Sequence, residues 1–313
     1  MNGSEKGRLP ICGRYAPSPT GELHLGNLRT ALIAWLSARS AGGEFLLRIE
    51  DLDSTRSKEE WIAVQESELG ALGLDWDGEP VRQSARLGLY AEALSRLEAE
   101  GLVYECFCSR REVREAASAP HSDPERPEAA YPGTCRDLTR TEREERRAAG
   151  RPAALRVRAG GERVVFSDQL HGEVGFTVDD FVVRRNDGDF AYNLAVVVDD
   201  AGQGVTEVVR GEDLLDSTSR QLWLYDRLGL TPPTAWLHLP LMLGPDGDRL
   251  AKRHGSVTLE ELEAEGDTPP RVTGRLAASL GLVPEGTECL ARELLDGLDR
   301  PTLIETLAVR PDA

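Results

Sequence analysis

A short loop near the start of the chain carries side chains and backbone groups that suit a nucleotide. Residues 17–27 read PSPTGELHLGN and lie between an expected strand and an expected helix. The N–H groups at the start of a helix, together with the positive end of its dipole, attract phosphate. Gly26 allows a flat base to lie against the main chain, while His24 and Asn27 supply donors for phosphate oxygens. The alternative is an ordinary proline-rich loop that Asn27 caps.

A second segment, far along the chain, carries two adjacent positive charges. Residues 250–256 read LAKRHGS and follow the turn-forming residues 245–248, PDGD. Cations on a mobile loop can follow negative charge as it develops on a departing pyrophosphate, which stabilises the transition state. Lys252 is the candidate for this role. The alternative for Lys252 and Arg253 is a solvated surface pair.

Three of the five cysteines lie close together in the sequence. Cys106 and Cys108 are separated by one residue, and Cys135 ends the segment YPGTC at 131–135. Three thiolates suit a tetrahedral zinc ion, and a reducing cytoplasm leaves such thiols unpaired. A fourth ligand is needed, and chemistry alone favours His121. Three cysteines without a metal are the alternative.

The elements expected around the first loop are a strand, a helix and a strand. A short strand is predicted over 9–15, and apolar residues at 28, 32, 35 and 36 place a helix that ends near Gly42. The next strand, over 45–49, carries Glu50 at its carboxyl end. Strand, helix and strand in about 40 residues is the βαβ unit of a parallel sheet, which indicates the α/β class.

The rest of the chain predicts further helices and strands. Helices are expected over 57–72 with Ser57 as N-cap, 85–100, 214–228 with Gly229 as C-cap, 271–280 and 291–298. Strands are expected over 164–166, 181–184, 194–198 and 207–209. Between 104 and 158 the composition changes to Cys, Pro, Arg and acidic residues, which indicates an insertion. We therefore divide the chain into a first half of the main domain at 1–103, an inserted subdomain at 104–160, a second half at 161–230, and a loop with a short helical region at 231–313.

Composition limits the classes of function. The 313 residues include 54 Asp and Glu against 37 Lys and Arg, and the formal charge of −17 argues against indiscriminate nucleic-acid binding. The segment 136–158 is the exception, because its arginines suit either an RNA backbone or a solvated helix. No apolar run approaches the roughly 20 residues that span a bilayer, and the start of the chain lacks the apolar core of a signal peptide. We expect a cytoplasmic, monomeric protein without membrane contact.

Together the two loops resemble the signature motifs of class I aminoacyl-tRNA synthetases. His24–Asn27 stands for the HIGH region and Leu250–Arg253 for the KMSKS region. Further segments look like the glutamyl branch of that family: residues 13–21 (GRYAPSPTG), 48–53 (RIEDLD) with Arg56, and 210–214 (RGEDL). The resemblance implies a Rossmann-type, doubly wound parallel sheet with an inserted zinc-binding, acceptor-like subdomain and a short helical C-terminal region.

Within that branch, the charges of glutamate indicate what its pocket must contain. Glu50 suits the α-ammonium group, Arg14 suits a carboxylate bidentately, and Arg210 takes the other carboxylate or orients the same one. The resemblance implies that glutamate is bound by Arg14, Tyr15, Ala16, Pro17, Ser18, Glu50, Tyr192 and Arg210. It also implies that ATP is bound by His24, Gly26, Asn27 and Lys252, with His24 and Lys252 as the catalytic residues.

The resemblance also changes the expected metal site. Related enzymes carry a Cys-x-Cys and Tyr-x-x-x-Cys pattern in which the tyrosine completes the site. One structural zinc ion held by Cys106, Cys108, Tyr131 and Cys135 is therefore expected, with His121 as the alternative fourth ligand.

The length of the chain points to one part of the glutamyl branch. Only 60 residues (313 − 253) follow Arg253, and they are acidic, which leaves too little mass for a large anticodon-reading module. The chain resembles the short paralogues, the glutamyl-queuosine tRNA(Asp) synthetases, although residues 252–255 look more like the conventional enzyme and Ala251 replaces a frequent serine. The resemblance implies activation of L-glutamate with ATP and Mg²⁺, then transfer to queuosine at the wobble position of tRNA(Asp). The alternatives are a truncated or discriminating glutamyl-tRNA synthetase that charges the tRNA 3′ end, and a catalytically silent paralogue that acts as a binding module.

Overall fold

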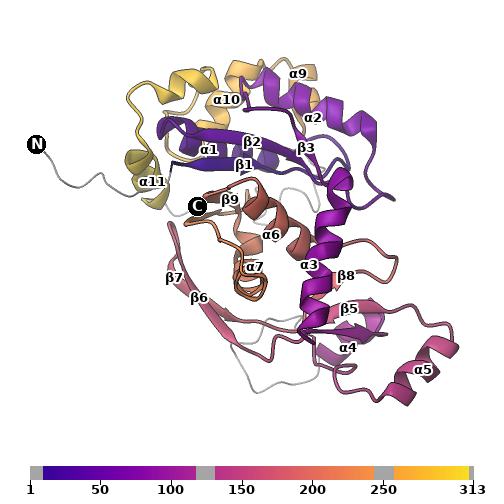
Figure 1. Cartoon of the computed structure of the whole chain (residues 1–313). Coiled ribbons are helices and arrows are strands. Elements are labelled where there is room, and N and C mark those ends of the chain that lie inside the picture. The colour runs from indigo at the N-terminus through magenta and orange to yellow at the C-terminus, as the bar shows by residue number, and fades with distance from the viewer. Residues whose placement is uncertain (1–9, 118–130, 243–256, 310–313) are drawn as a thin grey trace, which may run out of the picture.

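The computed structural model describes residues 10–117, 131–242 and 257–309, and its centre is a parallel sheet (Figure 1). Its first part comprises β1 (Cys12–Tyr15), α1 (Leu25–Ser40), β2 (Glu44–Ile49) and β3 (Val81–Arg82). β2 pairs in parallel with both β1 and β3. Gly43 is needed where α1 returns to β2, since a Cβ there would lie 2.3 Å from the carbonyl oxygen of Ile11.

The second part of the sheet comes from the other half of the chain. It comprises α6 (Tyr192–Gly202), β9 (Glu207–Gly211), α7 (Leu215–Leu228) and β10 (Ala235–Leu239), with β9 and β10 parallel. The two parts meet beside β1, where the Thr206 N–H donates to the Cys12 carbonyl at 2.9 Å. This is the doubly wound arrangement, in which ligands bind at the carboxyl ends of the strands where the connections diverge.

Helices and a second region of β-structure surround this sheet. α2 (Glu59–Ala71) connects β2 to β3. Between β3 and α6 the chain forms the short turn η1 (Gln83–Arg86) and α3 (Leu87–Ala99), then β4 (Val103–Cys106), α4 (Arg110–Ala117), α5 (Arg140–Ala148), β5 (Ala154–Val157), the hairpin β6 (Arg163–Asp168) and β7 (Gly172–Thr177), and β8 (Val182–Arg184). β4, β5 and β8 form a separate antiparallel sheet. This sheet lies at the opposite end of the molecule from β1 and β2 (Figure 1).

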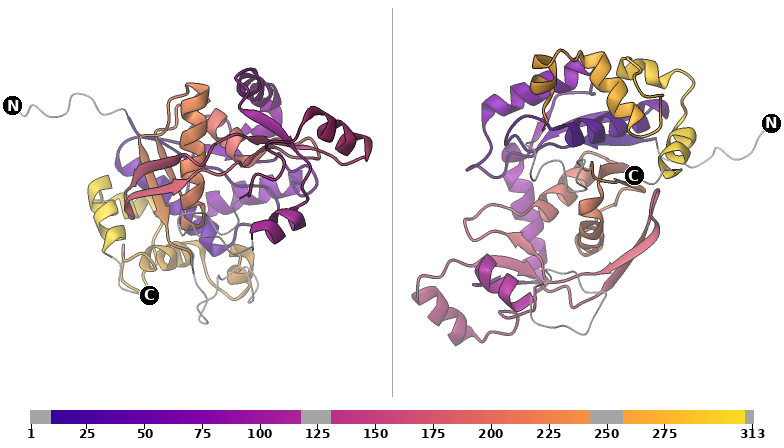
Figure 2. Two further views of the ribbon diagram at one scale, coloured as in Figure 1. Left: turned by 90° about the horizontal axis from the view of Figure 1, so that it is seen from below. Right: turned by 180° about the vertical axis from the view of Figure 1, so that it is seen from behind.

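The chain ends in short helices that pack on the first half of the sheet: α9 (Leu259–Ala264), α10 (Pro269–Ala278), η3 (Ala291–Leu295) and α11 (Arg300–Ala308). Figure 2 shows them beside α1, and their buried leucines belong to the same apolar core as Leu28 and Leu32 of that helix. Arg300, only 6% exposed, binds the buried carboxylate of Glu207 on β9. Among the described residues, no helix has the length and apolar character needed to cross a bilayer.

The expected α/β class, with its doubly wound sheet and short helical C-terminal region, is confirmed. Three details of the sequence analysis are wrong. Residues 194–198 belong to helix α6 and not to a strand. The prediction failed because Leu194 to Val197 are all buried, and a continuous apolar run lacks the alternation with polar residues that distinguishes a helix from a strand. Ser57 does not cap α2, which begins at Glu59 after Lys58. Over 291–298 only the turn η3 forms, and α11 was missed.

Other elements agree with expectation to within a few residues. β1 and α1 lie where the first strand and helix were predicted, and α7 ends at Gly229, whose φ of 59° lies in the left-handed region that favours glycine. The expected helix over 85–100 is preceded by η1 and begins at Leu87. Residues 104–160, which we expect to be an insertion, carry most of β4 and then α4, α5 and β5 among the described residues.

Candidate functional site

A cavity of about 730 Å³ opens where the two parts of the parallel sheet meet. It is bordered by the carboxyl ends of β1 and β9 and by the N-terminus of α1, which is the position expected for a ligand in this fold. Every residue expected to bind glutamate or ATP that falls in the described part of the chain lines it: Arg14, Tyr15, Ala16, Pro17, Ser18, His24, Gly26, Asn27, Glu50, Tyr192 and Arg210. The structure thus brings together residues that lie far apart in the sequence.

The N-terminus of α1 faces this cavity. His24, and not Asn27, is the N-cap: its Nδ1 accepts from the Asn27 N–H at 3.3 Å. Burial lowers the pKa of His24, so the neutral imidazole with its proton on Nε2 is favoured. A Cβ on Gly26 would lie 3.1 Å from that ring, so glycine leaves room for it. The arrangement leaves α1 able to receive an anion at its first turn.

Helix α2 supports the loop that precedes α1. Gln65 Nε2 donates to the carbonyl oxygens of Ser18 and Gly21 at 3.1 and 2.7 Å, and Glu68 accepts from the Leu23 N–H at 3.0 Å. Burial raises the pKa of Glu68 to about 7. The sequence analysis missed this support, although Gln65 and Glu68 are polar residues on the same buried face of α2 as Ile62 and Leu69.

A buried ionic network lies beneath the cavity. Asp200 on α6 accepts from Arg14 Nε at 3.3 Å and from Arg48 Nη1 at 2.6 Å, while Arg48 Nη2 donates to Glu50 at 3.2 Å. Burial raises the pKa of Glu50, and Arg48 and Arg14 oppose this effect. Burial also disfavours ionisation of Asp200, but Arg48 and Arg14 outweigh it and hold its pKa below the ordinary value. The network therefore fixes two of the expected substrate-binding side chains.

Arg210, on β9, is held on all of its donor positions. The side chain is 5% exposed, and in the described part of the chain no carboxylate forms a salt bridge with it. Its partners are uncharged: His238 Nε2, Tyr192 Oη, Gln221 Oε1, Thr218 Oγ1 and the Leu214 carbonyl, at 2.7 to 3.3 Å. Because every N–H of Arg210 already has a partner, a carboxylate would bind by replacing one or two of these neutral acceptors, and it would meet a buried positive charge that no carboxylate in the described part of the chain neutralises.

The segment that contains Lys252 lies outside the described residues, but the chain on both sides of it borders the cavity. Met242 precedes the segment and Val257 follows it, and both line the cavity. The Val257 carbonyl accepts from the Leu25 N–H at 3.0 Å, and Thr258 forms an antiparallel bridge with His24. The chain that follows the second motif segment is thus joined by backbone contacts to the first turn of α1.

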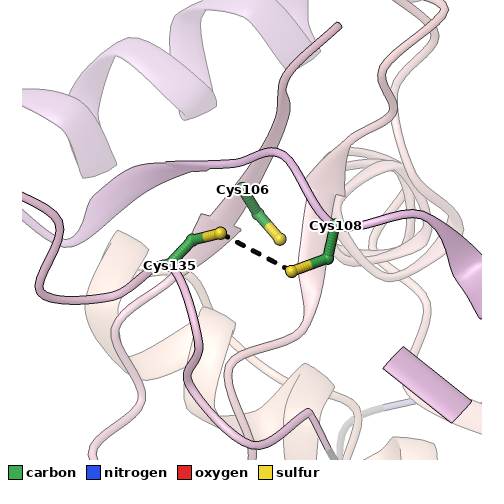
Figure 3. Close-up of side chains that lie close together, drawn as sticks. All are labelled: Cys106, Cys108 and Cys135. Carbon is green, nitrogen blue, oxygen red and sulfur yellow. Dashed lines mark hydrogen bonds between the residues drawn. The ribbon is translucent and has the colours of Figure 1, made fainter. Parts of the chain in front are cut away.

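The cysteine cluster is formed by Cys106 at the end of β4, Cys108 before α4 and Cys135 before α5 (Figure 3). The sulfur atoms of Cys106, Cys108 and Cys135 lie within 4.8 Å of one another, and all three are free thiols. The Tyr131 hydroxyl lies 3.3 Å from Cys106 Sγ and 3.8 Å from Cys108 Sγ. Three thiols and a phenol around one point fit the tetrahedral donor set that zinc requires. The alternative fourth ligand, His121, lies outside the described residues.

A second cavity, of about 760 Å³, connects the first with the cysteine cluster. Ser18, Glu50 and Tyr192 line both cavities, and Cys106 and Cys108 line the far end of the second. Its other lining residues include Asp53 and Arg156, which stand in segments that the sequence singled out, and Arg110, Arg185 and Phe190, which it did not. The one feature of the sequence that could have indicated this cavity was the abundance of arginine in and near residues 104–160.

The arginine-rich segment within 136–158 forms helix α5 together with β5. No residue of α5 is buried, and Thr139 caps it with a reciprocal bond to Glu142. Arg140 binds Glu144, and Arg147 binds Glu105. These contacts are those of a solvated helix, the alternative that the sequence left open.

Comparison with known proteins identifies related sequences along most of the chain. Residues 10–299 match the family model described as "tRNA synthetases class I (E and Q), catalytic domain". The chain is 56% identical over 287 residues to a glutamyl-Q tRNA(Asp) synthetase of Nocardia farcinica, with 92% of this chain and 89% of the relative covered. It is 46% identical over 272 residues to a glutamate–tRNA ligase of Oleidesulfovibrio alaskensis, with 85% of this chain and 56% of the relative covered.

A solved structure has the same fold. The glutamate-tRNA synthetase of Elizabethkingia anophelis superposes with a TM-score of 0.76 at 27% identity, covering 94% of this chain and 66% of that one. The present chain thus spans about two thirds of the length of that longer protein.

Proposed function

The chain belongs to the class I tRNA synthetases of the glutamyl and glutaminyl type, and we propose that it activates L-glutamate with ATP and then transfers the glutamyl group to queuosine at the wobble position of tRNA(Asp). The observation that carries the proposal is the cavity in which Glu50, Arg14 and Arg210 meet the N-terminus of α1. The acceptor is proposed from the names of the relatives, among which glutamyl-Q tRNA(Asp) synthetases are 43 to 56% identical over the aligned residues.

The charges around the cavity suit glutamate. Glu50 supplies an anion for the α-ammonium group, while Arg14 and Arg210 supply guanidinium groups for the carboxylates. Arg14 is already paired with Asp200, so the buried charge of Arg210, which has only neutral partners, is the stronger attraction for the side-chain carboxylate.

ATP is proposed to lie between the first turn of α1 and the segment that carries Lys252. His24, Gly26 and Asn27 border the place where its phosphates would meet helix N–H groups. Val257 is the fifth residue after Lys252, so an extended chain limits the distance between their Cα atoms to about 18 Å. Lys252 is therefore within reach of a triphosphate held there, where Mg²⁺ would accompany it.

The proposed chemistry has two steps and needs no side-chain nucleophile. In the first, an α-carboxylate oxygen of glutamate bonds to the α-phosphorus of ATP, the bond to the bridging oxygen breaks, and pyrophosphate leaves. In the second, a hydroxyl of the acceptor bonds to the activated carbonyl carbon, loses its proton, and AMP leaves. Arg14, Glu50 and Arg210 orient glutamate, and Lys252 stabilises charge on the departing phosphates.

The second cavity is the proposed entrance for the acceptor nucleoside. It shares Ser18, Glu50 and Tyr192 with the glutamate site, so a group within it lies next to the activated carbonyl. Phe190 offers an aromatic surface and Arg185 a cation, which suit a base and a phosphate of a single-stranded RNA loop. Zinc held by the cysteine cluster would join β4 to the segment that ends at Cys135. It would thereby fix the wall of the second cavity that Cys106 and Cys108 form.

One experiment tests both the donor and the acceptor. The protein is incubated with ATP, labelled glutamate and separate tRNA pools, including tRNA(Asp) with and without queuosine. Label on queuosine-containing tRNA(Asp) that nuclease digestion recovers in the anticodon nucleoside, and not in the 3′-terminal adenosine, supports the proposal; label only on tRNA(Glu) contradicts it. That second outcome would favour a truncated glutamyl-tRNA synthetase, a reading supported by the 46% identity to a glutamate–tRNA ligase. Absence of glutamate-dependent ATP–pyrophosphate exchange would favour a silent paralogue.

A further inference from the structure

A buried chain of hydrogen bonds runs from β6 through β10 to Arg210. Asp168 Oδ2, at the end of β6, lies 2.6 Å from His238 Nδ1 on β10, and His238 Nε2 lies 3.0 Å from Arg210 Nε on β9. His238 is 0% exposed and Asp168 2%. Neither residue is among those that line the two cavities, so their connection to a ligand passes through Arg210.

The neighbouring groups fix which nitrogen of His238 carries a proton. Two groups lie beside His238 Nε2: Arg210 Nε and, at 3.1 Å, the Thr218 hydroxyl, which can either donate or accept. Arginine Nε always bears hydrogen and only donates, so Nε2 accepts from Arg210. Burial disfavours ionisation of Asp168, but bonds from His238 and from the N–H groups of Leu170 and His171 outweigh it and lower its pKa. An ionised carboxylate only accepts, so His238 Nδ1 must donate. Burial lowers the pKa of His238 and keeps the imidazole neutral.

We infer that His238, oriented by Asp168, is a positioning residue that holds Arg210 for selective recognition of the side-chain carboxylate of glutamate. The imidazole fixes the guanidinium through its Nε and, being neutral, leaves the positive charge for the ligand. A carboxylate in place of the His238 imidazole would neutralise the charge of Arg210. A protonated imidazole would direct its Nε2–H at the Nε–H of Arg210, and neither group could accept a hydrogen bond. The inference rests on the proposed function, in which Arg210 contacts a carboxylate of glutamate.

Two substitutions of His238 separate its two hydrogen bonds. His238→Asn retains a donor near the position of Nδ1, which can still bind Asp168, but removes the acceptor for Arg210 Nε. His238→Gln can place its amide oxygen near the position of Nε2 and so retain that acceptor. In Asp168→Asn, the amide N–H of the new side chain would donate to His238 Nδ1, which favours the tautomer with its proton on Nε2. The Nε2–H would then face the Nε–H of Arg210, so the hydrogen bond between them would be lost.

The substitutions are compared in glutamate-dependent ATP–pyrophosphate exchange. We expect His238→Asn and Asp168→Asn to raise the KM for glutamate about tenfold to hundredfold, because each leaves the buried Nε–H of Arg210 without an acceptor. The KM for ATP should change little. Preference for glutamate over glutamine should fall by a similar factor. His238→Gln should restore most of both quantities. His171→Gln is the control, because the His171 side chain binds the main-chain carbonyl of His238, and the main-chain N–H that donates to Asp168 remains in the variant, which should keep the wild-type values.

A measurement without turnover tests the same network. The ¹⁵N NMR resonances of the His238 imidazole in the full chain are assigned as those that are absent from the spectrum of His238→Gln. In the wild-type protein at pH 7 these resonances should be those of a neutral imidazole with its proton on Nδ1. An imidazolium or a proton on Nε2 would overturn the inference, as would a His238→Asn protein with unchanged glutamate KM or with equal losses for glutamate and ATP. Wild-type protein that shows no exchange would instead contradict the proposed function, and the NMR result would still decide the state of His238.

Discussion

Arg48 Nη1 donates to Asp200 Oδ1 at 2.6 Å, and both side chains are removed from solvent. Arg48 lies on β2 and Asp200 on α6, so this pair joins the two halves of the doubly wound sheet beneath the cavity. Because Asp200 also accepts from Arg14, the contact fixes a glutamate-binding guanidinium at the same time as it joins the halves. Stability and substrate binding therefore depend on the same carboxylate.

Asp200→Asn should destabilise the protein strongly. Removing one partner of a buried ionic network leaves uncompensated charge and costs about 3 to 5 kcal/mol. The free energy of unfolding in urea measures this loss. Glu144→Gln, which breaks the exposed pair with Arg140, is the control and should cost less than about 1 kcal/mol. Equal effects of the two substitutions would show that the buried network adds nothing to stability.

Lys252→Ala should slow formation of glutamyl-adenylate far more than it weakens glutamate binding. A cation that acts on the departing pyrophosphate is felt mainly in the transition state, and its loss slows the step about hundredfold to thousandfold. Rapid-quench measurement of adenylate and equilibrium binding of glutamate separate the two effects. Lys58→Ala removes a side chain that is 62% exposed and serves as the control. Losses of equal size in rate and binding would argue against the role proposed for Lys252.

Some residues of this site could be predicted from the sequence, and others could not. Gly26, Glu50 and Arg210 stand in motifs or at the ends of expected strands, and local pattern was enough to single them out. Asp200 and His238 gave no such signal: they act through partners more than a hundred residues away or on another strand, and only tertiary packing reveals them. The buried run at 194–197 was misassigned for a related reason, since complete burial removes the periodicity that separates helix from strand.

The cysteine cluster should hold about one equivalent of zinc per chain, the content of a single tetrahedral site. Cys106→Ser combined with Cys108→Ser should abolish that content, whereas Cys289→Ser, a buried cysteine elsewhere, should retain it. Metal analysis of the purified proteins measures both. Zinc that persists in the double variant would remove the proposed site.

The fourth ligand can be decided by two further substitutions. If the Tyr131 hydroxyl, 3.3 Å from Cys106 Sγ, completes the site, Tyr131→Phe should weaken zinc affinity while His121→Ala leaves it unchanged. Competition with a chelator gives the affinity of each variant. The reverse pattern would assign the ligand to His121.

Glu68→Gln should stabilise the protein at alkaline pH. Burial raises the pKa of Glu68 to about 7 from an ordinary value of 4.5, so the folded state binds its proton more tightly than the unfolded state does. For such a carboxyl the free energy of unfolding falls as pH rises from about 4.5 to about 7. Glutamine cannot ionise, yet its oxygen can still accept from the Leu23 N–H, so the variant keeps the contact and loses this dependence.

Unfolding in urea at pH 5 and at pH 8 measures that difference. The advantage of Glu68→Gln over the wild type should be small at pH 5 and larger at pH 8, where the wild-type carboxylate is ionised beneath the loop and is further disfavoured by Glu22 and Glu260. Glu92→Gln, at an exposed position on α3, should show no such growth. A constant difference between wild type and Glu68→Gln at the two pH values would mean that Glu68 is already ionised at pH 5. In that case the hydrogen bond to Leu23 would outweigh burial, and the loop before α1 would be held by a charged carboxylate.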